Sequence, residues 1–317
     1  SALHFTSCGT ESDNWAIRAA AWQGRHMGRH IITTAVEHSA VLEPCRQLEQ
    51  EGYEVTYLKP DRTGHISAGQ VAEALREDTV LVSVMLVNNE TGCLFPVADI
   101  ARLLKERGSR ALLHCDAVQG FLKVPCDPAG WGVDLMSLSA HKIGGPKGIG
   151  ALYIRPDLRN LRPLLAGGGQ EEGLRSGTEA TAQIAGFAKA VELRCDHLED
   201  KLRHMAEVKA YAVEKLSAIP DLQIIGDGKA PHVLSVSMAG WPSQNVVTDL
   251  GSQGICISAG SACHQGKSSQ VVAALKLPKR VAAGVIRLSF GPETTFTEID
   301  ACAEALRNHH DRRMPML

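Results

Sequence analysis

Apolar and polar residues alternate along residues 3 to 139 with two different periods. Short apolar runs are separated by stretches in which apolar residues recur at helical spacing. The longest run, Thr79 to Val87, is apolar almost throughout, as expected for a strand of a parallel sheet covered on both faces. Further strands are predicted at Leu3–Ser7, His30–Thr34, Glu54–Leu58, Ala111–Cys115 and Leu135–Ser139, with helices near 15–24, 40–51, 67–76 and 97–108. This order predicts βαβ units and a mostly parallel sheet with helices on both faces.

The pattern changes after residue 139. Gly148 to Arg155 predicts a strand that returns antiparallel to the main sheet, and Gly167 to Thr178 is too rich in glycine for a regular element. Helical spacing then continues from Thr181 to Ser217, as in a connector between domains. Four more strands are predicted, at 222–225, 233–238, 255–258 and 285–290. We therefore expect two domains, a large one over residues 1–200 and a smaller α/β domain over 201–317.

Composition narrows the classes of function. The chain has 317 residues, of which 44% are hydrophobic and 21% charged, and its formal charge is −2. This balance shows no bias toward nucleic acid or an anionic membrane surface. The apolar run from Thr79 to Val87 is too short to span a bilayer, and no secretory signal opens the sequence. The nine cysteines form no C-x-x-C pair. We expect a reducing, cytoplasmic setting and no metal site.

Two residues with complementary chemistry follow neighbouring predicted strands. Lys142 comes just after the strand that ends at Ser139, and Asp116 follows the strand that ends at Cys115. Open α/β sheets bind ligands at the carboxyl ends of their strands. A lone lysine there is more often a solvated surface cation. Pyridoxal phosphate needs both groups, because a lysine holds its aldehyde as a Schiff base and a carboxylate keeps its pyridine nitrogen protonated.

Two further stretches of the first domain suit the same cofactor. Glycine, threonine and serine stand at a predicted helix N-terminus in Cys8 to Asn14, where backbone N–H groups can bind a phosphate. Simple capping by Thr10 or Ser12 is an equal alternative on local grounds. His38 follows the strand 30–34 and could lie against a pyridine ring, although a capping or packing role is the commoner one for a lone histidine.

The second domain has two candidate groups of its own. Cys263 lies in Ser258 to Ser269, a small, polar stretch that predicts an exposed loop, with His264 and Lys267 nearby to favour a thiolate. Most cysteines are instead inert buried residues. Arg287 lies in a predicted strand, where its guanidinium could hold a substrate carboxylate or form a structural salt bridge.

The motifs together resemble one family. His-Cys-Asp-Ala-Val-Gln at 114–119, Ser-Leu-Ser-Ala-His-Lys at 137–142 and Ser-Ala-Gly-Ser-Ala-Cys at 258–263 are similar to the group I, NifS/IscS-like cysteine desulfurases. These belong to the class V aminotransferases among the fold-type I enzymes of pyridoxal 5'-phosphate. The resemblance covers nearly the whole chain. It departs from the family at Cys8, where a glycine is usual, and the family's opening strand and helix are absent from these 317 residues.

The resemblance implies a role for each matching residue. Lys142, Cys263 and His38 would be catalytic, with Cys263 on a loop of the smaller C-terminal domain. Asn89 and Arg287 would bind the substrate. The residues expected at the cofactor are Gly9, Thr10, His38, Asn89, Asp116, Gln119, Ser139, His141, Lys142 and Thr178, the last contributed across a homodimer.

The resemblance also implies a reaction and its alternatives. L-cysteine would become L-alanine while Cys263 takes the sulfur as a persulfide, for delivery to an acceptor protein in iron–sulfur cluster assembly or tRNA thiolation. Selenocysteine lyase and β-lyase chemistry on the same cofactor are the enzymatic alternatives. A truncated, inactive paralogue that serves as a binding partner in sulfur transfer is the alternative without catalysis.

Overall fold

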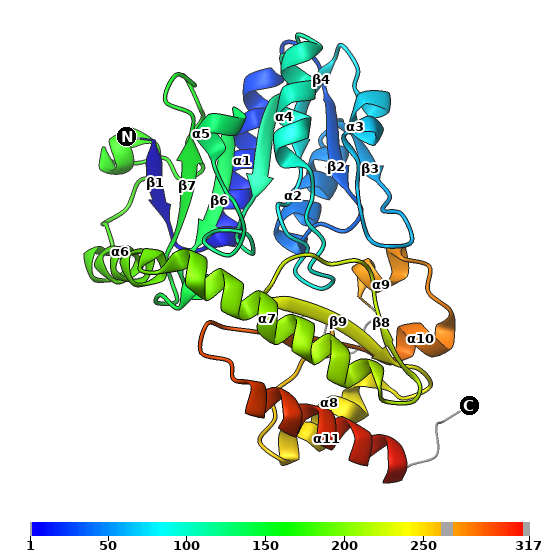
Figure 1. Cartoon of the computed structure of the whole chain (residues 1–317). Helices are drawn as coiled ribbons and strands as arrows, with labels where there is room; N and C mark the ends of the chain where they lie inside the picture. The colour runs from blue at the N-terminus through cyan, green and yellow to red at the C-terminus, as the bar shows by residue number, and fades with distance from the viewer. Residues whose placement is uncertain (1, 261–268, 313–317) are drawn as a thin grey trace. The chain divides into compact units, whose positions relative to one another are not determined.

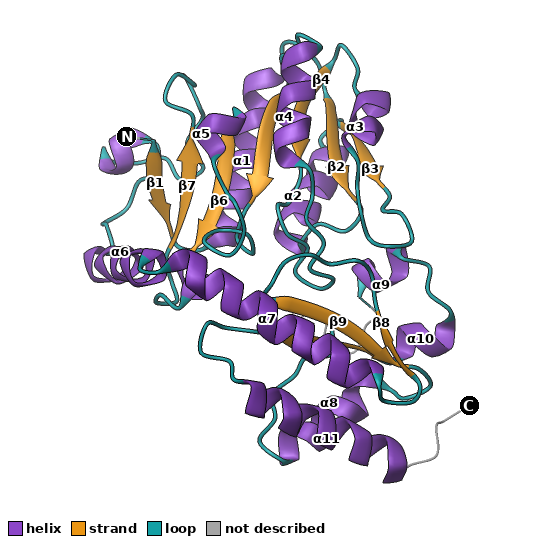
Figure 2. Cartoon of the chain, viewed as in Figure 1, coloured by secondary structure: helices purple, strands orange, loops and turns teal. Residues whose placement is uncertain are grey.

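The structure is a computed structural model that describes residues 2–260 and 269–312, so Cys263 and the expected loop around it lie outside the described residues (Figures 1 and 2). The chain forms two compact units. Unit 1 comprises Ser1–Lys59, Ile66–Val87 and Phe95–Asp196, and unit 2 comprises Pro60–His65, Asn88–Leu94 and His197–Leu317. The short segments 60–65 and 88–94 were expected in the first domain but belong to unit 2.

Unit 1 is built on a seven-stranded sheet in the order β1-β7-β6-β5-β4-β2-β3. Strands β2 to β6 are parallel to their neighbours within that group, and β7 is antiparallel to both β1 and β6, as predicted. The strands are β1 Leu3–Thr6, β2 His30–Thr34, β3 Glu54–Leu58, β4 Thr79–Ser83, β5 Leu112–Asp116, β6 Leu135–Ser139 and β7 Gly150–Ile154.

The expected strand over residues 79–87 is wrong in its length, because β4 ends at Ser83. The backbone N–H groups of Val84 and Leu86 still bond to carbonyls of β5. The N–H of Met85 instead donates to the carboxylate of Glu37, at 3.0 Å. A side chain therefore takes the hydrogen bond that a strand on the other side would need, and the ladder stops.

Helices lie on both faces of this sheet (Figure 2). α1 (Gly9–Gly24) and α2 (Ser39–Gln50) contact each other on one face, and α4 (Val97–Glu106) contacts α3 (Ala68–Ala74) and α5 (Pro128–Trp131). A capping box of Ser67 and Gln70 begins α3, which confirms the helix predicted near residues 67–76. The apolar side of α1 buries Trp15 and Ile17 against β6 and β7, so this helix is held firmly to the sheet that carries the site.

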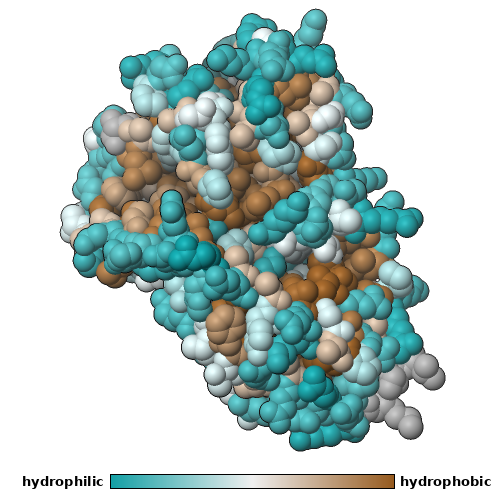
Figure 3. Space-filling model, viewed as in Figure 1, coloured by the Kyte–Doolittle hydropathy of each residue, from teal (hydrophilic) through white to brown (hydrophobic). Residues whose placement is uncertain are grey.

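The strands β1, β6 and β7 leave part of one sheet face open. A hollow of about 410 Å³ lies there. Apolar side chains line it, and apolar residues gather in this part of unit 1 in Figure 3. They include Phe5, Met136, Leu138, Tyr153 and Phe187.

The single helical stretch predicted for residues 181–217 is wrong. The chain forms α6 (Thr181–Cys195) and α7 (Leu198–Ser217), separated by an extended Asp196 and by His197 with φ of 49°. A left-handed residue ends helical hydrogen bonding. The apolar spacing on either side resembles one continuous helix, so the pattern could not show this break.

Unit 2 contains an antiparallel sheet in the order β10-β9-β8, with β8 Leu222–Ile224, β9 Val233–Met238 and β10 Val285–Ser289. Its main core joins this sheet to α7, α8 (Ser243–Ser252) and α11 (Phe296–Arg312). The short helices are α9 (Gln270–Ala274) and α10 (Lys279–Ala283). No helix in the described part of the chain is long and apolar enough to cross a membrane.

The strand expected at 255–258 is also wrong. Only an isolated bridge pairs Ser258 with Arg287. The N–H of Ile255 bonds back to the carbonyl of Leu250, so the first part of this segment closes α8 and does not extend the sheet.

Candidate active site

The N-terminus of α1 forms one wall of the candidate site in unit 1. Cys8 precedes the helix in an extended conformation, with φ of −175° and ψ of 170°, which any residue adopts, so it replaces the usual glycine without strain. Its side chain makes no capping hydrogen bond. A Cβ on Gly9 would lie 2.7 Å from Cγ2 of Val118, so glycine is needed for the close approach to the segment after β5. Thr10 is exposed on the first turn.

An ion pair ties the glycine-rich segment to this turn. Arg175 donates from Nε to Oε1 of Glu11 at 2.7 Å and from Nη2 to Oε2 at 3.1 Å. Burial opposes the ionisation of Glu11, but hydrogen bonds from Arg175 and Ser7 outweigh it and lower its pKa. Thr178, in the same segment, is exposed and borders a hollow of about 200 Å³ that Ser7 also lines.

Asp116 ends β5 and is only 6% exposed. Its Oδ1 accepts a hydrogen bond from the N–H of Val118 at 2.9 Å. Burial raises the pKa of this carboxyl group, whereas the Val118 hydrogen bond and the charges of His38 and Lys142 lower it. The structure thus places His38 and Lys142, predicted from separate motifs, within electrostatic reach of Asp116.

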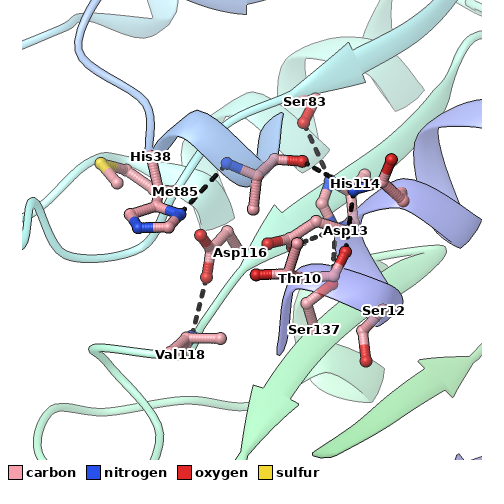
Figure 4. A network of polar contacts seen from close by, with 12 residues as sticks. Thr10, Ser12, Asp13, His38, Ser83, Met85, His114, Asp116, Val118 and Ser137 are labelled. Carbon is pink, nitrogen blue, oxygen red and sulfur yellow. Dashed lines mark hydrogen bonds and ion pairs between the residues drawn. The ribbon is translucent and has the colours of Figure 1, made fainter. Parts of the chain in front are cut away.

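His38 lies at the N-terminus of α2. Its Nδ1 accepts a hydrogen bond from the N–H of Ala40 at 3.1 Å (Figure 4). Because Nδ1 is the acceptor, the neutral imidazole carries its proton on Nε2. The capping role weighed as an alternative is therefore real, and it fixes the tautomer of the ring.

Lys142 lies in a 3₁₀ turn (Ala140–Ile143) that directly follows β6, and it is exposed. The neighbouring His141 shares a hydrogen bond of 2.8 Å between its Nδ1 and Oγ of the buried Ser139. Burial lowers the pKa of His141, and the positive charges of Lys142, Lys123 and Lys147 lower it further. These lysines therefore make the electrostatic potential at His141 positive.

Gln119 follows Asp116 at the same sheet edge. Its Oε1 accepts from the ammonium of Lys123 at 3.2 Å. This contact assigns the amide oxygen, so the NH₂ end of Gln119 is the end that can donate to a ligand.

A buried polar layer beneath these residues was not found by sequence reasoning. His114 is fully buried in β5, and its two ring nitrogens pair with hydroxyls of Ser83, at 2.8 Å, and Ser137, at 2.9 Å. Burial lowers its pKa to about 3, so it is neutral. Asp13, on the sheet side of α1, lies 3.5 Å from Nε2 of His114 (Figure 4). Burial and the charge of Asp116 raise the pKa of Asp13 well above its usual value.

Glu37 belongs to the same layer. Its Oε1 accepts from Oγ1 of Thr34 at 2.8 Å and from the N–H of Met85 at 3.0 Å. Burial, with a contribution from the charge of Asp116, raises its pKa to about 8. Its position next to His38 was the only available signal in the sequence.

The raised pKa of Glu37 predicts how stability depends on pH. Between pH 4.5 and about 8 the folded state holds a proton on Glu37 that the unfolded state has lost. The contribution of the protonated Glu37 to the free energy of unfolding is therefore complete below pH 4.5, and it is lost as pH rises through about 8. Glutamine does not titrate, so Glu37→Gln should remove this loss. Its free energy of unfolding should rise relative to that of the parent chain by on the order of a few kcal/mol between about pH 5 and about pH 8.

Urea unfolding of the cofactor-free protein across this pH range measures the effect. Glu73→Gln, at an exposed glutamate in α3, is the control. The difference from the parent reports Glu37 together with its effect on Asp13, whose pKa the charge of Glu37 raises. Asp116 and His114 remain in both proteins, and protonation of His114 lowers the stability in the opposite direction, as pH falls below 6.5. A constant difference between Glu37→Gln and the parent chain at all pH values would contradict the prediction.

The predicted substrate-binding residues meet within unit 2. Arg287 of β10 donates from Nη1 to the carbonyl oxygen of Asn89 at 2.8 Å and from Nη2 to Oγ of Ser258 at 3.4 Å. Its buried Nε has no hydrogen-bond partner among the described residues. Burial lowers the pKa of Arg287, and the charge of Glu90 raises it. Asn89 therefore contacts Arg287 through its backbone.

The polar groups that unit 1 presents fit the chemistry of pyridoxal phosphate. The N-terminal turn of α1 offers backbone N–H groups that Cys8 does not cap. Asp116 offers a buried carboxylate, and Lys142 an exposed amine at the end of β6. These are the phosphate, pyridine and aldehyde partners that the cofactor needs.

Comparisons with known proteins agree with this geometry. The family model for aminotransferase class V matches residues 1–302. A cysteine desulfurase of Nostoc sp. is 42% identical over 96% of this chain and 77% of its own length. The structure of a NifS-like protein has a TM-score of 0.91 at 36% identity, covering 98% of this chain and 82% of its own. A structure described as SspA in complex with cysteine has a TM-score of 0.77 at 36% identity, covering 92% of this chain and 82% of its own. By sequence match and by fold, this chain belongs to the cysteine desulfurase family of the class V aminotransferases.

Proposed function

We propose that this chain is a pyridoxal 5'-phosphate-dependent cysteine desulfurase that converts L-cysteine to L-alanine and leaves the sulfur as a persulfide on Cys263. The observation that carries the proposal is the buried carboxylate of Asp116, on which the charges of His38 and Lys142 both act to lower its pKa. The relatives named cysteine desulfurase, and the related structure that contains cysteine, support the choice of substrate.

The cofactor would be held by the N-terminal turn of α1 and by residues at the carboxyl ends of the strands. The phosphate would bind the first turn of α1 at Gly9 and Thr10, and Asp116 would keep the pyridine nitrogen protonated. When bound, the cofactor supplies an electron sink for the bonds broken at the substrate amino acid. His38, Gln119, Ser139 and His141 would orient it, with Asn89 as a further contact.

The protein groups perform the proton and sulfur steps. Lys142 would take and return the proton at the substrate Cα. Arg287 would bind the substrate carboxylate. This is supported by its Nε, which has no hydrogen-bond partner within residues 2–260 and 269–312, since Nε and Nη2 together can form a bidentate pair. The thiolate of Cys263 would attack the substrate sulfur, so that an S–S bond forms and the C–S bond breaks. The electron pair of that C–S bond stays with the carbon skeleton, which is protonated to give alanine.

The stoichiometry of products tests the reaction class. Purified protein loaded with pyridoxal phosphate should form one alanine for each sulfur atom recovered on the protein or, after reduction, as sulfide. A β-lyase would give pyruvate and ammonia instead, and a selenocysteine lyase would release selenide from selenocysteine while leaving cysteine unchanged. An inactive paralogue would form no product although it binds the cofactor. The persulfide would pass to an acceptor protein of iron–sulfur assembly or tRNA thiolation.

We also propose that the active unit is a homodimer in which Thr178 reaches the partner's cofactor phosphate. The exposure of Thr178, and the anchoring of its segment through Arg175, support this arrangement. Mixing a Lys142→Ala chain with a Thr178→Ala chain should restore part of the activity that each lacks, because one of the two mixed sites is intact. Sedimentation that shows a fully active monomer would contradict the proposal.

A further inference from the structure

A tight turn at residues 88–91 of unit 2 presents its backbone to Arg287. Oδ1 of Asn88 accepts from the N–H groups of Glu90, at 3.0 Å, and Thr91, at 2.9 Å, and from Oγ1 of Thr91. These bonds hold the turn in one shape. The carbonyl of Asn89 can then accept from Nη1 of Arg287 at 2.8 Å.

Glu90 is a buried carboxylate in the middle of this turn. It is 6% exposed, and its Oε2 accepts from Oγ of Ser269. A Cβ on Gly260, which has φ of +68°, would lie 3.5 Å from the same Oε2 and 3.6 Å from Cβ of Ser269. The charge of Glu90 also raises the pKa of Arg287. Gly260 and Ser269 are the described residues on either side of 261–268, so both flanks of that segment meet at one carboxylate.

Ser269 has a second role that strengthens this contact. Its Oγ accepts from the N–H groups of Val271, at 3.1 Å, and Val272, at 3.3 Å, and so caps α9. The hydroxyl proton is therefore left for Glu90, and the hydrogen bond to Glu90 ties the start of α9 to the turn.

On the basis of the proposed function, we propose that Glu90 is a positioning residue that couples substrate binding at Arg287 to the two flanks of the segment carrying Cys263. Burying a carboxylate is costly unless charge and hydrogen bonds compensate for it. Arg287 and Ser269 both contribute to that compensation here. A substrate carboxylate bound at Arg287 competes with Glu90 for the charge of the guanidinium. When the substrate binds, the carboxylate of Glu90 is therefore stabilised less by Arg287 and depends more on its hydrogen bond from Ser269.

This competition predicts opposite signs for two substitutions. Glu90→Gln removes the competing charge but keeps a hydrogen-bond acceptor, so the protein should bind L-alanine, the product of the proposed reaction, about three- to tenfold more tightly. Ser269→Ala removes a donor from Glu90, so that the carboxylate of Glu90 depends more on the charge of Arg287. L-alanine should then bind about two- to fivefold more weakly. In the Glu90→Gln background Ser269→Ala should have no further effect.

Calorimetric titration of the cofactor-loaded protein with L-alanine measures these affinities. Glu293→Gln and Ser252→Ala, at exposed positions of unit 2, are matched controls. The second readout is the rate at which iodoacetamide alkylates Cys263, followed by mass spectrometry of its peptide. L-alanine should change this rate at least about threefold in the parent protein and have no effect in Glu90→Gln or Ser269→Ala, because coupling between two sites is reciprocal.

The outcomes separate this proposal from the proposed function. Arg287→Gln should weaken L-alanine binding at least about tenfold. If it does not, Arg287 is not the carboxylate-binding residue, and both the substrate role and the coupling are wrong. If Arg287→Gln weakens binding but Glu90→Gln and Ser269→Ala both weaken it too, Glu90 is merely structural and only the coupling is wrong. Should Glu90→Gln fail to fold, the alkylation experiment on Ser269→Ala still decides.

Discussion

Replacement of Cys263 by serine is expected to abolish sulfur release while leaving cofactor and substrate binding intact. A hydroxyl is a far weaker nucleophile toward sulfur than a thiolate, so turnover of L-cysteine to alanine should fall by at least about 10³-fold. Cofactor absorbance and the spectral response to L-cysteine should be those of the parent protein. Mass spectrometry of the parent should find an added sulfur atom on the Cys263 peptide, and none on the variant.

Cys256→Ser provides the matched control, because Cys256 is an exposed free cysteine of the same unit. It should retain full turnover. Cysteine consumption by Cys263→Ser at the parent rate, with pyruvate as the product, would move the assignment to a β-lyase. Full turnover to alanine would show that another thiol accepts the sulfur.

Replacement of Lys142 by alanine should remove both the covalent attachment of the cofactor and catalysis. The exposed amine at the end of β6 is the group expected to form the Schiff base, and it also moves the Cα proton. The loss of turnover should be at least about 10³-fold, since a covalent partner and a general base disappear together. Borohydride treatment followed by peptide mapping should find pyridoxyl-lysine at residue 142 in the parent protein and none in the variant.

The control for this change is Lys147→Ala, which removes a nearby exposed lysine that contributes to the same positive field. It should keep the borohydride-reducible attachment. A pyridoxyl group found on another lysine of the Lys142→Ala protein, with turnover retained, would show that Lys142 is not the attachment site.

Glu37 shows where the sequence pattern failed in detail. The run from Thr79 to Val87 is apolar enough for one strand, yet the carboxylate of Glu37 takes the N–H of Met85 and ends β4 at Ser83. Glu37 and Met85 are far apart in the sequence, and hydrophobic periodicity carries no information about such a bond. The same holds for His197, whose left-handed backbone divides a helical stretch that looks continuous.

Asp13 was missed for a related reason. In the sequence it is one of several polar residues at a helix start, where carboxylates are common. Only the packing of α1 on the sheet buries it beside His114 and Asp116, and burial then raises its pKa. Glu90 is a similar case, because segment 88–94 follows a strand of unit 1 but joins unit 2.

The sheet of unit 1 and the chemistry at its edge could be predicted from the amino-acid sequence. Buried parallel strands require local apolar runs, and a residue that directly follows such a run must lie at the carboxyl edge, so Asp116 and Lys142 could be placed there without a structure. Which charged groups act on one another could be learned only from the folded chain. The charge of His38 acts on Asp116, and Arg287 donates a hydrogen bond to the carbonyl of Asn89, although each pair is far apart in the sequence. Glu37 and Glu90 are likewise buried by residues distant in the sequence. Their energies depend on distance and on the exclusion of water, which arise only when the elements pack.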